Sequence, residues 1–145
     1  AGGPAVTTWD ATERLEELEA VLEALALLPD DFVILVEGRR DIGALHLLGV
    51  KREMVAVQTQ GGILGVAEAL AVAGKKAAIL TDWDRKGGQL ARLLKQNLGS
   101  CCVTYDEDLR RRLARVSRGE VKDVESLPTY FSRLVKAVQI EQGRS

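Results

Sequence analysis

The chain of 145 residues has few of the side chains that bind transition metals: one histidine and two cysteines. His46 has no second histidine or cysteine at the spacing of a zinc site, so zinc chemistry is not expected. Cys101 and Cys102 are consecutive residues of a predicted strand, where they would project to opposite faces and not pair with each other. We therefore expect two buried thiols in a reducing compartment.

Long hydrophobic runs are also missing. No apolar run approaches the roughly 20 residues that cross a membrane, and residues 1–4 lack the basic and then apolar pattern of a signal peptide. We expect a cytoplasmic protein without membrane contact. A chain of 145 residues, 46% of them hydrophobic, suits one domain over residues 1–145 and leaves no room for a second catalytic domain.

Charge is unevenly distributed along the chain. Up to Asp84 there are 7 Lys and Arg against 14 Asp and Glu, whereas the remainder has 13 against 7. A basic second half suits contact with a polyanion, although solvated basic helix faces give the same composition.

Four short apolar runs alternate with helix-like segments. The runs cover residues 32–36, 54–57, 77–81 and 101–104. This alternation predicts an α/β fold, a compact Rossmann-like sheet of about four parallel strands with helices on both faces. The sheet core would span about 32–104. A cover helix within 9–29, opened by a capping box of Asp10 and Glu13, would precede it, and a helical segment over 106–141 would follow.

Acidic side chains come directly after two of the predicted strands. Glu37 follows 32–36, and Asp82 and Asp84 follow 77–81. Because ligands of open α/β sheets bind at the carboxyl ends of the strands, these three carboxylates form a candidate site. Residues two apart on an extended strand point the same way, so Asp82 and Asp84 should face one point. Trp83 should lie on the opposite side, packed against the protein.

Carboxylates without histidine or cysteine favour a hard cation, Mg²⁺ or Mn²⁺. Asp82 and Asp84 would position the metal for phosphoryl-transfer chemistry, and Glu37 would complete its shell or move a proton. Two alternatives stay open. An Asp-x-Asp after a strand is often a turn and a helix N-cap. Gly38 and Asp41 are possible further site residues, but an acid such as Asp41 in a first helical turn also stabilises that helix without any ligand.

The motif around Glu37, Val36-Glu37-Gly38-Arg39-Arg40-Asp41, together with the later stretch from Leu80 to Gly88, resembles the Toprim domain. The resemblance covers about Phe32 to Thr104. It implies a four-stranded parallel sheet, Glu37 as a general acid or base, and Asp82 and Asp84 as Mg²⁺ ligands.

Among Toprim proteins, the small size and the stretch from Thr59 to Gly62 are most similar to the stand-alone members related to ribonuclease M5 and primase. No topoisomerase-type tyrosine accompanies the motifs, and a further role for Asp106 and Asp108 is left open.

The first hypothesis is a Mg²⁺-dependent nuclease or strand-transfer enzyme acting on nucleic acid, with structured RNA favoured over DNA. Its phosphate contacts would come from the basic second half, namely Arg85, Lys86, Arg110, Arg111 and Arg112. A second hypothesis is a non-catalytic adaptor that binds nucleic acid or protein. A third is a phosphatase of the haloacid dehalogenase kind, which Asp-x-Asp suggests but the following Arg85-Lys86-Gly87 does not favour.

Overall fold

The computed structural model describes residues 9–59 and 61–143 and contains one sheet of four parallel strands, in the order β2-β1-β3-β4. The strands are β1 (Phe32–Val36), β2 (Met54–Ala56), β3 (Lys76–Ile79) and β4 (Tyr105–Asp106). The helices are α1 (Ala11–Ala26), α2 (Arg39–Leu47), α3 (Gly62–Ala73), α4 (Arg85–Ser100), α5 (Asp108–Val116) and α6 (Leu127–Gly143), with a short 3-10 turn η2 (Val57–Thr59). The predicted α/β class is confirmed.

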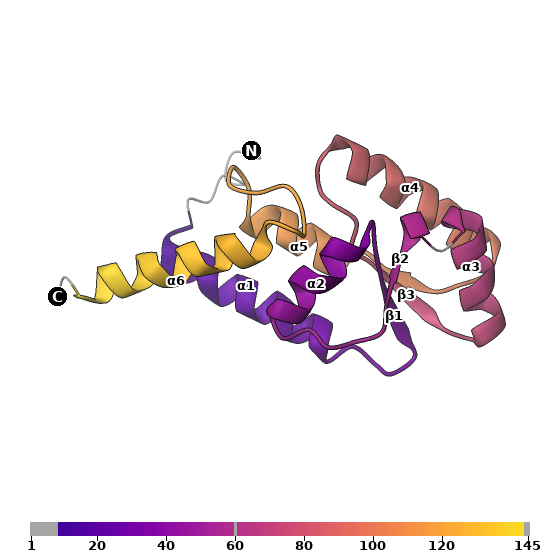
Figure 1. Cartoon of the computed structure of the whole chain (residues 1–145), viewed down its shortest axis with the longest axis horizontal. Helices are drawn as coiled ribbons and strands as arrows, with labels where there is room; N and C mark the ends of the chain where they lie inside the picture. The colour runs from indigo at the N-terminus through magenta and orange to yellow at the C-terminus, as the bar shows by residue number, and fades with distance from the viewer. Residues whose placement is uncertain (1–8, 60, 144–145) are drawn as a thin grey trace, which may run out of the picture.

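The helices lie in two layers on either side of the sheet (Figure 1). Alternate residues of β1 explain this arrangement, because successive strand side chains point to opposite faces. Val33 and Leu35 pack with α3 and α4, while Ile34 and Val36 pack with α1, α2, α5 and α6. Every one of these four β1 side chains is fully buried, so each face of the sheet has its own hydrophobic core.

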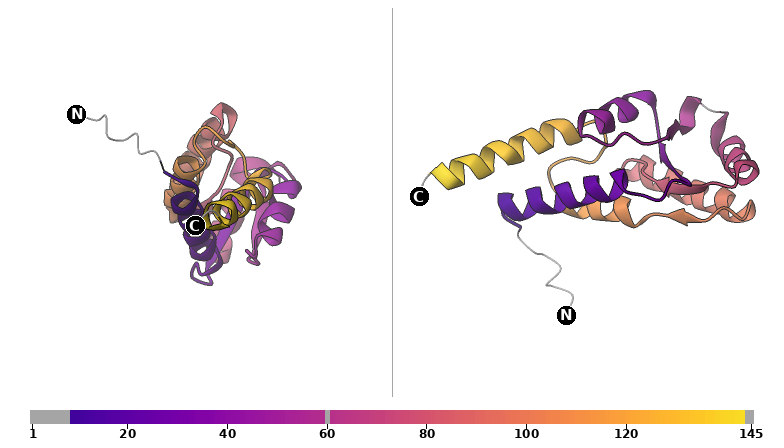
Figure 2. Two further views of the ribbon diagram at one scale, coloured as in Figure 1. Left: turned by 90° about the vertical axis from the view of Figure 1, so that its left-hand side faces the viewer. Right: turned by 90° about the horizontal axis from the view of Figure 1, so that it is seen from below.

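The first and last helices pack side by side and extend beyond the sheet (Figure 2). The predicted capping box opens α1: the Asp10 side chain accepts from the Glu13 amide at 2.8 Å, and the Glu13 side chain accepts from the Asp10 amide at 3.0 Å. Leu18, Val21 and Leu25 belong to the buried stripe of α1, at the three- and four-residue spacing of one helix face. No helix in the described ranges is long and apolar enough to span a membrane.

The predicted fourth strand over 101–104 is wrong. Residue Cys101 instead caps the end of α4, and Cys102 has a left-handed backbone with φ of 59°. The strand that pairs with β3 comes later, at Tyr105–Asp106. Both thiols are free, but Cys102 is exposed and Cys101 only partly buried, which corrects the predicted burial. The run looked like a strand because it is apolar, but it is apolar because this end of α4 packs on the sheet, where Leu98 and Val103 are buried.

The other element boundaries shift by a few residues. The central strand β3 ends at Ile79, and Leu80 and Thr81 follow it as fully buried residues, with the Leu80 amide donating to the Leu35 carbonyl of β1 at 2.8 Å. The C-terminal helical segment is interrupted by a loop, residues 117–126, between α5 and α6. The sequence did not predict where this loop lies, and it returns to the carboxyl edge of the sheet.

Candidate active site at the carboxyl edge

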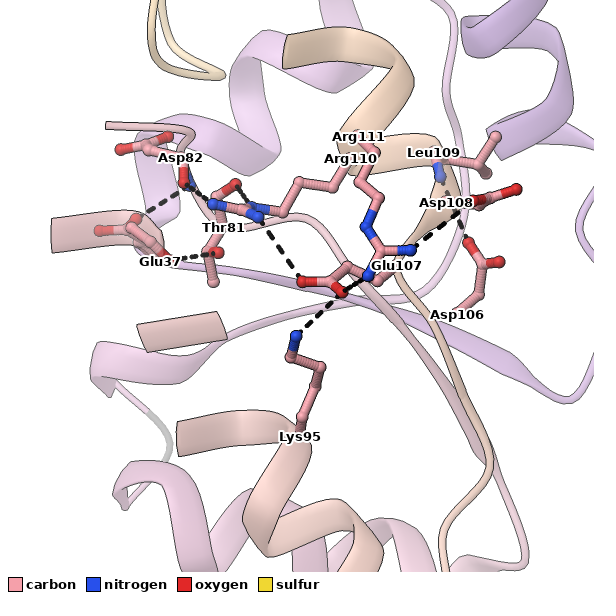
Figure 3. Close-up of polar contacts among 11 residues, drawn as sticks. Glu37, Thr81, Asp82, Lys95, Asp106, Glu107, Asp108, Leu109, Arg110 and Arg111 are labelled. Atoms are coloured by element: carbon pink, nitrogen blue, oxygen red, sulfur yellow. Dashed lines mark hydrogen bonds and ion pairs between the residues drawn. The ribbon is translucent and has the colours of Figure 1, made fainter. Parts of the chain in front are cut away.

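Glu37 and Asp82 meet at the carboxyl ends of neighbouring strands. β1 and β3 are adjacent and in register, with Leu35 opposite Ile79, so the residues that follow each strand leave the sheet together. The Asp82 amide donates to the Glu37 Oε2 atom at 2.9 Å (Figure 3). The structure therefore brings together these two residues, which lie 45 positions apart in sequence.

The two carboxylates line an open hollow of about 390 Å³. We call it the acidic hollow, and its wall consists of Glu37, Gly38, Arg39, Arg40, Asp41, Gln58, Thr59, Asp82 and Glu125. Four of these residues are acidic and two are basic. Arg40 is almost fully exposed and lies 3.7 Å from Glu125, so its charge is directed to the rim rather than to Glu37 and Asp82.

Asp82 holds its proton far more tightly than an ordinary aspartate. Burial, the largest cause, and the negative charges of Glu37, Asp41 and Asp123 together raise its pKa to about 7. A hydrogen bond that Asp82 Oδ1 accepts from the Val124 amide, at 3.0 Å, acts in the opposite direction. The site thus concentrates negative charge that its own hydrogen bonds do not compensate.

Asp41 serves the helix and the hollow at once. Its Oδ2 atom accepts from the Gly38 amide at 3.1 Å, which satisfies a free N–H at the start of α2. It is also buried in the wall of the acidic hollow. Burial raises the pKa of Asp41, and the charges of Glu125 and Asp123 contribute, although backbone hydrogen bonds from Gly38 and Glu37 lower it. The contact that stabilises the helix is therefore real, and a role of Asp41 in the site stays a prediction.

Asp84 does not join Asp82 in the hollow. It is the N-cap of α4, and its Oδ1 atom accepts from the Gly87 amide at 2.7 Å. Its side chain is exposed and does not line the acidic hollow. Both aspartates lie beyond the last residue of β3, so the strand alternation used to predict a common direction does not apply to them.

A close approach of α4 fixes the backbone of Asp82. The buried Thr81 hydroxyl donates to the Gly87 carbonyl at 2.9 Å. A side chain at Gly87 would place its Cβ atom 1.9 Å from the Asp82 carbonyl oxygen, which no packing accommodates. The glycine is therefore needed for this approach, not for an unusual backbone angle.

Arg110 fixes the same segment from the other side (Figure 3). Its guanidinium donates to the Thr81 carbonyl at 2.9 Å and to the Asp82 carbonyl at 2.8 Å. Glu107, only 8% exposed, balances the charge of Arg110 at 3.6 Å and also accepts from Lys95 and Arg111. Arg110 thus connects a compensated carboxylate, Glu107, with the main chain of Asp82.

The other predicted phosphate-binding residues differ in their availability. Arg85 and Lys86 are exposed in the first turn of α4. Arg111 is exposed and paired with Glu107 and Asp108. Arg112 is held by Glu17 in a two-pronged contact at 2.8 and 2.9 Å, which ties α5 to α1.

Asp106 and Asp108, whose role the sequence left open, do not line the acidic hollow. Asp106 accepts from the Leu109 amide at 3.5 Å at the start of α5. Asp108 is exposed and lies 4.0 Å from Arg111. Both therefore act on α5, in keeping with acids near a helix N-terminus.

Sequence reasoning missed the loop that closes the site. Val124 donates its amide to Asp82, Glu125 lines the hollow, and Asp123 adds negative charge to it. The run Lys122-Asp123-Val124-Glu125, with its two acids between helices, was the one available signal. Its proximity to Asp82 depends on the path of the chain after α5, which local patterns do not reveal.

The donor atoms of the site fit a hard divalent cation only in part. Over residues 9–59 and 61–143, no three acidic, histidine or cysteine side chains are grouped closely enough to form a ready metal cage. Glu37 and Asp82 each use one oxygen to accept a backbone hydrogen bond, so the second oxygen of each remains for a ligand. Mg²⁺ is commonly held by one or two carboxylates, several waters and a substrate phosphate, which matches this pair.

Residues 32–118 match the Toprim domain, and the chain belongs to that family. Relatives of similar length carry the name UPF0292 protein. The chain is 38% identical to one from Methanosarcina acetivorans over 122 residues, which cover 84% of this chain and 83% of the relative. It is 33% identical to one from Pyrococcus abyssi over 124 residues, covering 84% and 89%.

A solved structure of a protein from Aquifex aeolicus has the same fold. It aligns with a TM-score of 0.57 at 22% identity, over 81% of this chain and 97% of that one. The resemblance noted in the sequence is thus confirmed at the level of family and fold, which sets aside the haloacid dehalogenase hypothesis. Toprim domains generally bind divalent metal ions and are associated with nucleic acids.

Proposed function

We propose that this protein is a Mg²⁺- or Mn²⁺-dependent enzyme that cleaves or transfers phosphodiester bonds in nucleic acid, with structured RNA as the first substrate to test, as in the ribonuclease M5 group. The observation that carries the proposal is the direct contact of Glu37 with the Asp82 amide in an acidic hollow. Membership of the Toprim family supports it.

Glu37 and Asp82 would hold the metal ion through the oxygens that accept no backbone hydrogen bond. Asp84 could join them only through Oδ2, since its Oδ1 atom caps α4. A bound divalent cation would neutralise charge on the scissile phosphate and lower the pKa of an attacking water or hydroxyl. Glu37 would accept or return the proton, because its buried position and its bond to Asp82 fix the carboxylate at the edge of the hollow.

Arg110 has a positioning role in this scheme. It donates to the Thr81 and Asp82 carbonyls and so fixes the main chain that carries the Asp82 carboxylate. The exposed Arg85 and Lys86 beside the motif would contact the phosphate backbone of the substrate.

One observation favours a second function, a non-catalytic adaptor that binds nucleic acid or a protein partner. Asp84 is engaged as a helix cap, and the described residues hold no preformed cage of three carboxylates. An adaptor would keep its partner binding when Asp82 is changed to Asn, whereas an enzyme would lose metal-dependent turnover.

The deciding experiment measures cleavage of labelled structured RNA, single-stranded DNA and duplex DNA with Mg²⁺ or Mn²⁺. Wild type is compared with Glu37→Gln and Asp82→Asn, and with Asp108→Asn as a control that also neutralises one acid. We expect metal-dependent cleavage of one substrate class, at least about 100-fold slower in both site variants and unchanged in the control. Absence of cleavage by metal-loaded wild type would favour the adaptor.

A further inference from the structure

A second hollow of about 400 Å³ includes Trp83, the residue that follows Asp82, in its wall. We call it the basic hollow, and it is lined by Trp83, Ala114, Arg115, Arg118, Gly119, Val121 and Lys122. Its charged lining residues are all cations, drawn from the end of α5 and from the loop that follows. Neither Arg115, Arg118 nor Lys122 had been assigned a role from the sequence.

The three cations of the basic hollow have no ion-pair partner within the described part of the chain. Other basic residues nearby do: Arg110, Arg111, Arg112 and Arg133 each lie within 4.0 Å of a carboxylate. No such contact is made by Arg115, Arg118 or Lys122 over residues 9–59 and 61–143. Arg115 interacts with Glu17 only beyond ion-pair distance. Three neighbouring cations without a direct ion pair raise the local potential and attract an anion.

Trp83 gives the basic hollow an aromatic wall in a fixed position. Its indole N–H donates to the Val121 carbonyl at 2.9 Å, and its amide donates to the Lys122 carbonyl at 2.9 Å. The residue packs partly against the core, as predicted, yet it also lines the hollow. A ring held by its own hydrogen bond loses little conformational freedom when a planar ligand stacks on it.

The two hollows share one piece of backbone. Asp82 lines the acidic hollow, and the next residue, Trp83, lines the basic one. On the facing loop, Lys122 lines the basic hollow, and Val124 two residues later donates its amide to Asp82. A ligand in the basic hollow would therefore contact the residues that directly follow Asp82 and directly precede the loop segment bonded to it.

We propose that the basic hollow binds one unpaired nucleotide of a nucleic-acid strand, with its base on Trp83 and its phosphate between Arg115, Arg118 and Lys122. An aromatic face next to uncompensated cations suits a base and its phosphate, and it does not suit an isolated inorganic anion equally well. The volume suffices for one nucleotide, but a base within a duplex cannot stack on a protein side chain. The inference deepens the proposed function, on which it rests, by selecting substrates with an unpaired nucleotide next to the scissile phosphate.

The test is binding of a fluorescein-labelled single-stranded 12-mer, measured by anisotropy in EDTA so that no cleavage occurs. The triple variant Arg115→Glu, Arg118→Glu, Lys122→Glu is compared with Arg92→Glu, Lys136→Glu, Lys51→Glu, which carries the same charge change on exposed residues outside the hollow. We expect the first triple to bind at least about tenfold more weakly at low salt with a shallower salt dependence, and the control to stay within about threefold of wild type. Equal losses of affinity in both triple variants would show that binding depends only on overall charge, and this result would overturn the proposed site.

The aromatic contact has its own readout. In a Trp9→Phe background, Trp83 is the one remaining tryptophan, and the 12-mer should quench its fluorescence. Trp83→Leu should weaken binding about fivefold or more, and Trp83→Phe should restore most of it. Circular dichroism checks the fold of each variant. If Trp83→Leu does not fold, fluorescence quenching by the 12-mer and the affinities of the two triple charge variants test the proposal instead.

Three results would overturn the proposal: no quenching by the 12-mer, equal affinity for a blunt duplex, or binding of adenosine monophosphate but not of the strand. Because all of these are measured without metal and without turnover, they are independent of the cleavage assay. Loss of cleavage in Glu37→Gln with normal quenching would confirm both proposals separately. Normal cleavage with no quenching would leave the proposed function standing and remove this site.

Discussion

Two buried carboxylates of this protein, Glu37 and Glu107, are equally inaccessible at 8% exposure and have opposite surroundings. Glu107 lies among Lys95, Arg110 and Arg111, with contacts of 2.7 to 3.6 Å (Figure 3). Glu37 accepts from a backbone amide and lies next to Asp82 and Asp41, which are acidic. The first arrangement satisfies a buried charge, and the second accumulates charge that an external cation would satisfy.

This difference separates a buried charge that the fold itself satisfies from the site that we propose to be functional. A buried charge without a partner costs stability, so a fold keeps one where it binds something. Arg110 belongs to both regions, since it pairs with Glu107 and donates to the Asp82 carbonyl. The ion-paired cluster around Glu107 therefore holds in place the main chain that carries the Asp82 carboxylate.

The largest predicted effect comes from Gly87→Ala, which acts on the acidic region alone. The new methyl group would meet the Asp82 carbonyl oxygen at 1.9 Å, so either α4 or the Asp82 segment must move. We expect a loss of about 3 kcal/mol in the free energy of unfolding, measured by urea denaturation. Gly88→Ala is the control, because its Cβ atom would meet only Arg110 Nη2 at 3.8 Å. Equal stability of both variants would contradict the close approach.

The second effect comes from removing the compensated charge. Glu107→Gln leaves Arg110 and Lys95 without their carboxylate, and we expect a loss of about 2 kcal/mol in the free energy of unfolding. Asp108→Asn, a neighbouring exposed acid, should change it by less than about 0.5 kcal/mol. If Glu107→Gln lowered the free energy of unfolding as little as Asp108→Asn, the contrast between the Glu107 and Glu37 regions would be wrong.

The third predicted effect is a gain in the free energy of unfolding rather than a loss, and its size depends on pH. The folded pKa of Asp82 is about 7, above its unfolded value of 3.8, so wild type loses stability as pH rises between these values and stays at the lower level above them. Asp82→Asn removes this cost. In EDTA the variant should be about 1 kcal/mol more stable than wild type at pH 8, after allowance for solvent screening, and equal to it near pH 3.5. Thermal unfolding across this range is the measurement, and a gain that does not vary with pH would contradict the assignment.

The smallest effect is expected for the ion pair between Glu17 and Arg112, which belongs to neither of the two compared regions. The hydrogen bond from Arg112 lowers the pKa of Glu17 below 4.5, so the pair stabilises the protein above that pH and is lost as the pH falls through the folded value. A double-mutant cycle with Glu17→Gln and Arg112→Gln should give a coupling of about 0.5 kcal/mol at pH 7. Coupling that persists at pH 2 would show that the contact is not electrostatic.

Much of the fold was predictable because its signals are local. Three of the four apolar runs of strand length and the capping box at Asp10 are each read within a few residues. The strand over 101–104 was wrong because the run that looked like a strand is the buried end of α4, and only packing on the sheet distinguishes the two. The order β2-β1-β3-β4 then places the ends of β1 and β3 side by side, as parallel α/β sheets require.

The candidate site was predictable in part. Glu37 and Asp82 follow strands, so their place at the carboxyl edge followed from the pattern, and their direct contact agrees with it. Asp84 was equally prominent in the sequence, but it caps α4. Arg112 looked like a free cation, although Glu17 from another helix holds it. Such partners lie tens of residues away, and no local spacing encodes them.

The alternation of strands and helices, the family and the two acidic strand ends are encoded by residues close together along the chain. Which charges are satisfied depends instead on how the elements pack. Packing brings Glu107 to Arg110 and Lys95, and it leaves Arg115, Arg118 and Lys122 without a direct ion pair in the described part of the chain. An ion pair acts over a few ångströms, whereas the segments that supply its two charges meet only when the sheet and its helices have packed.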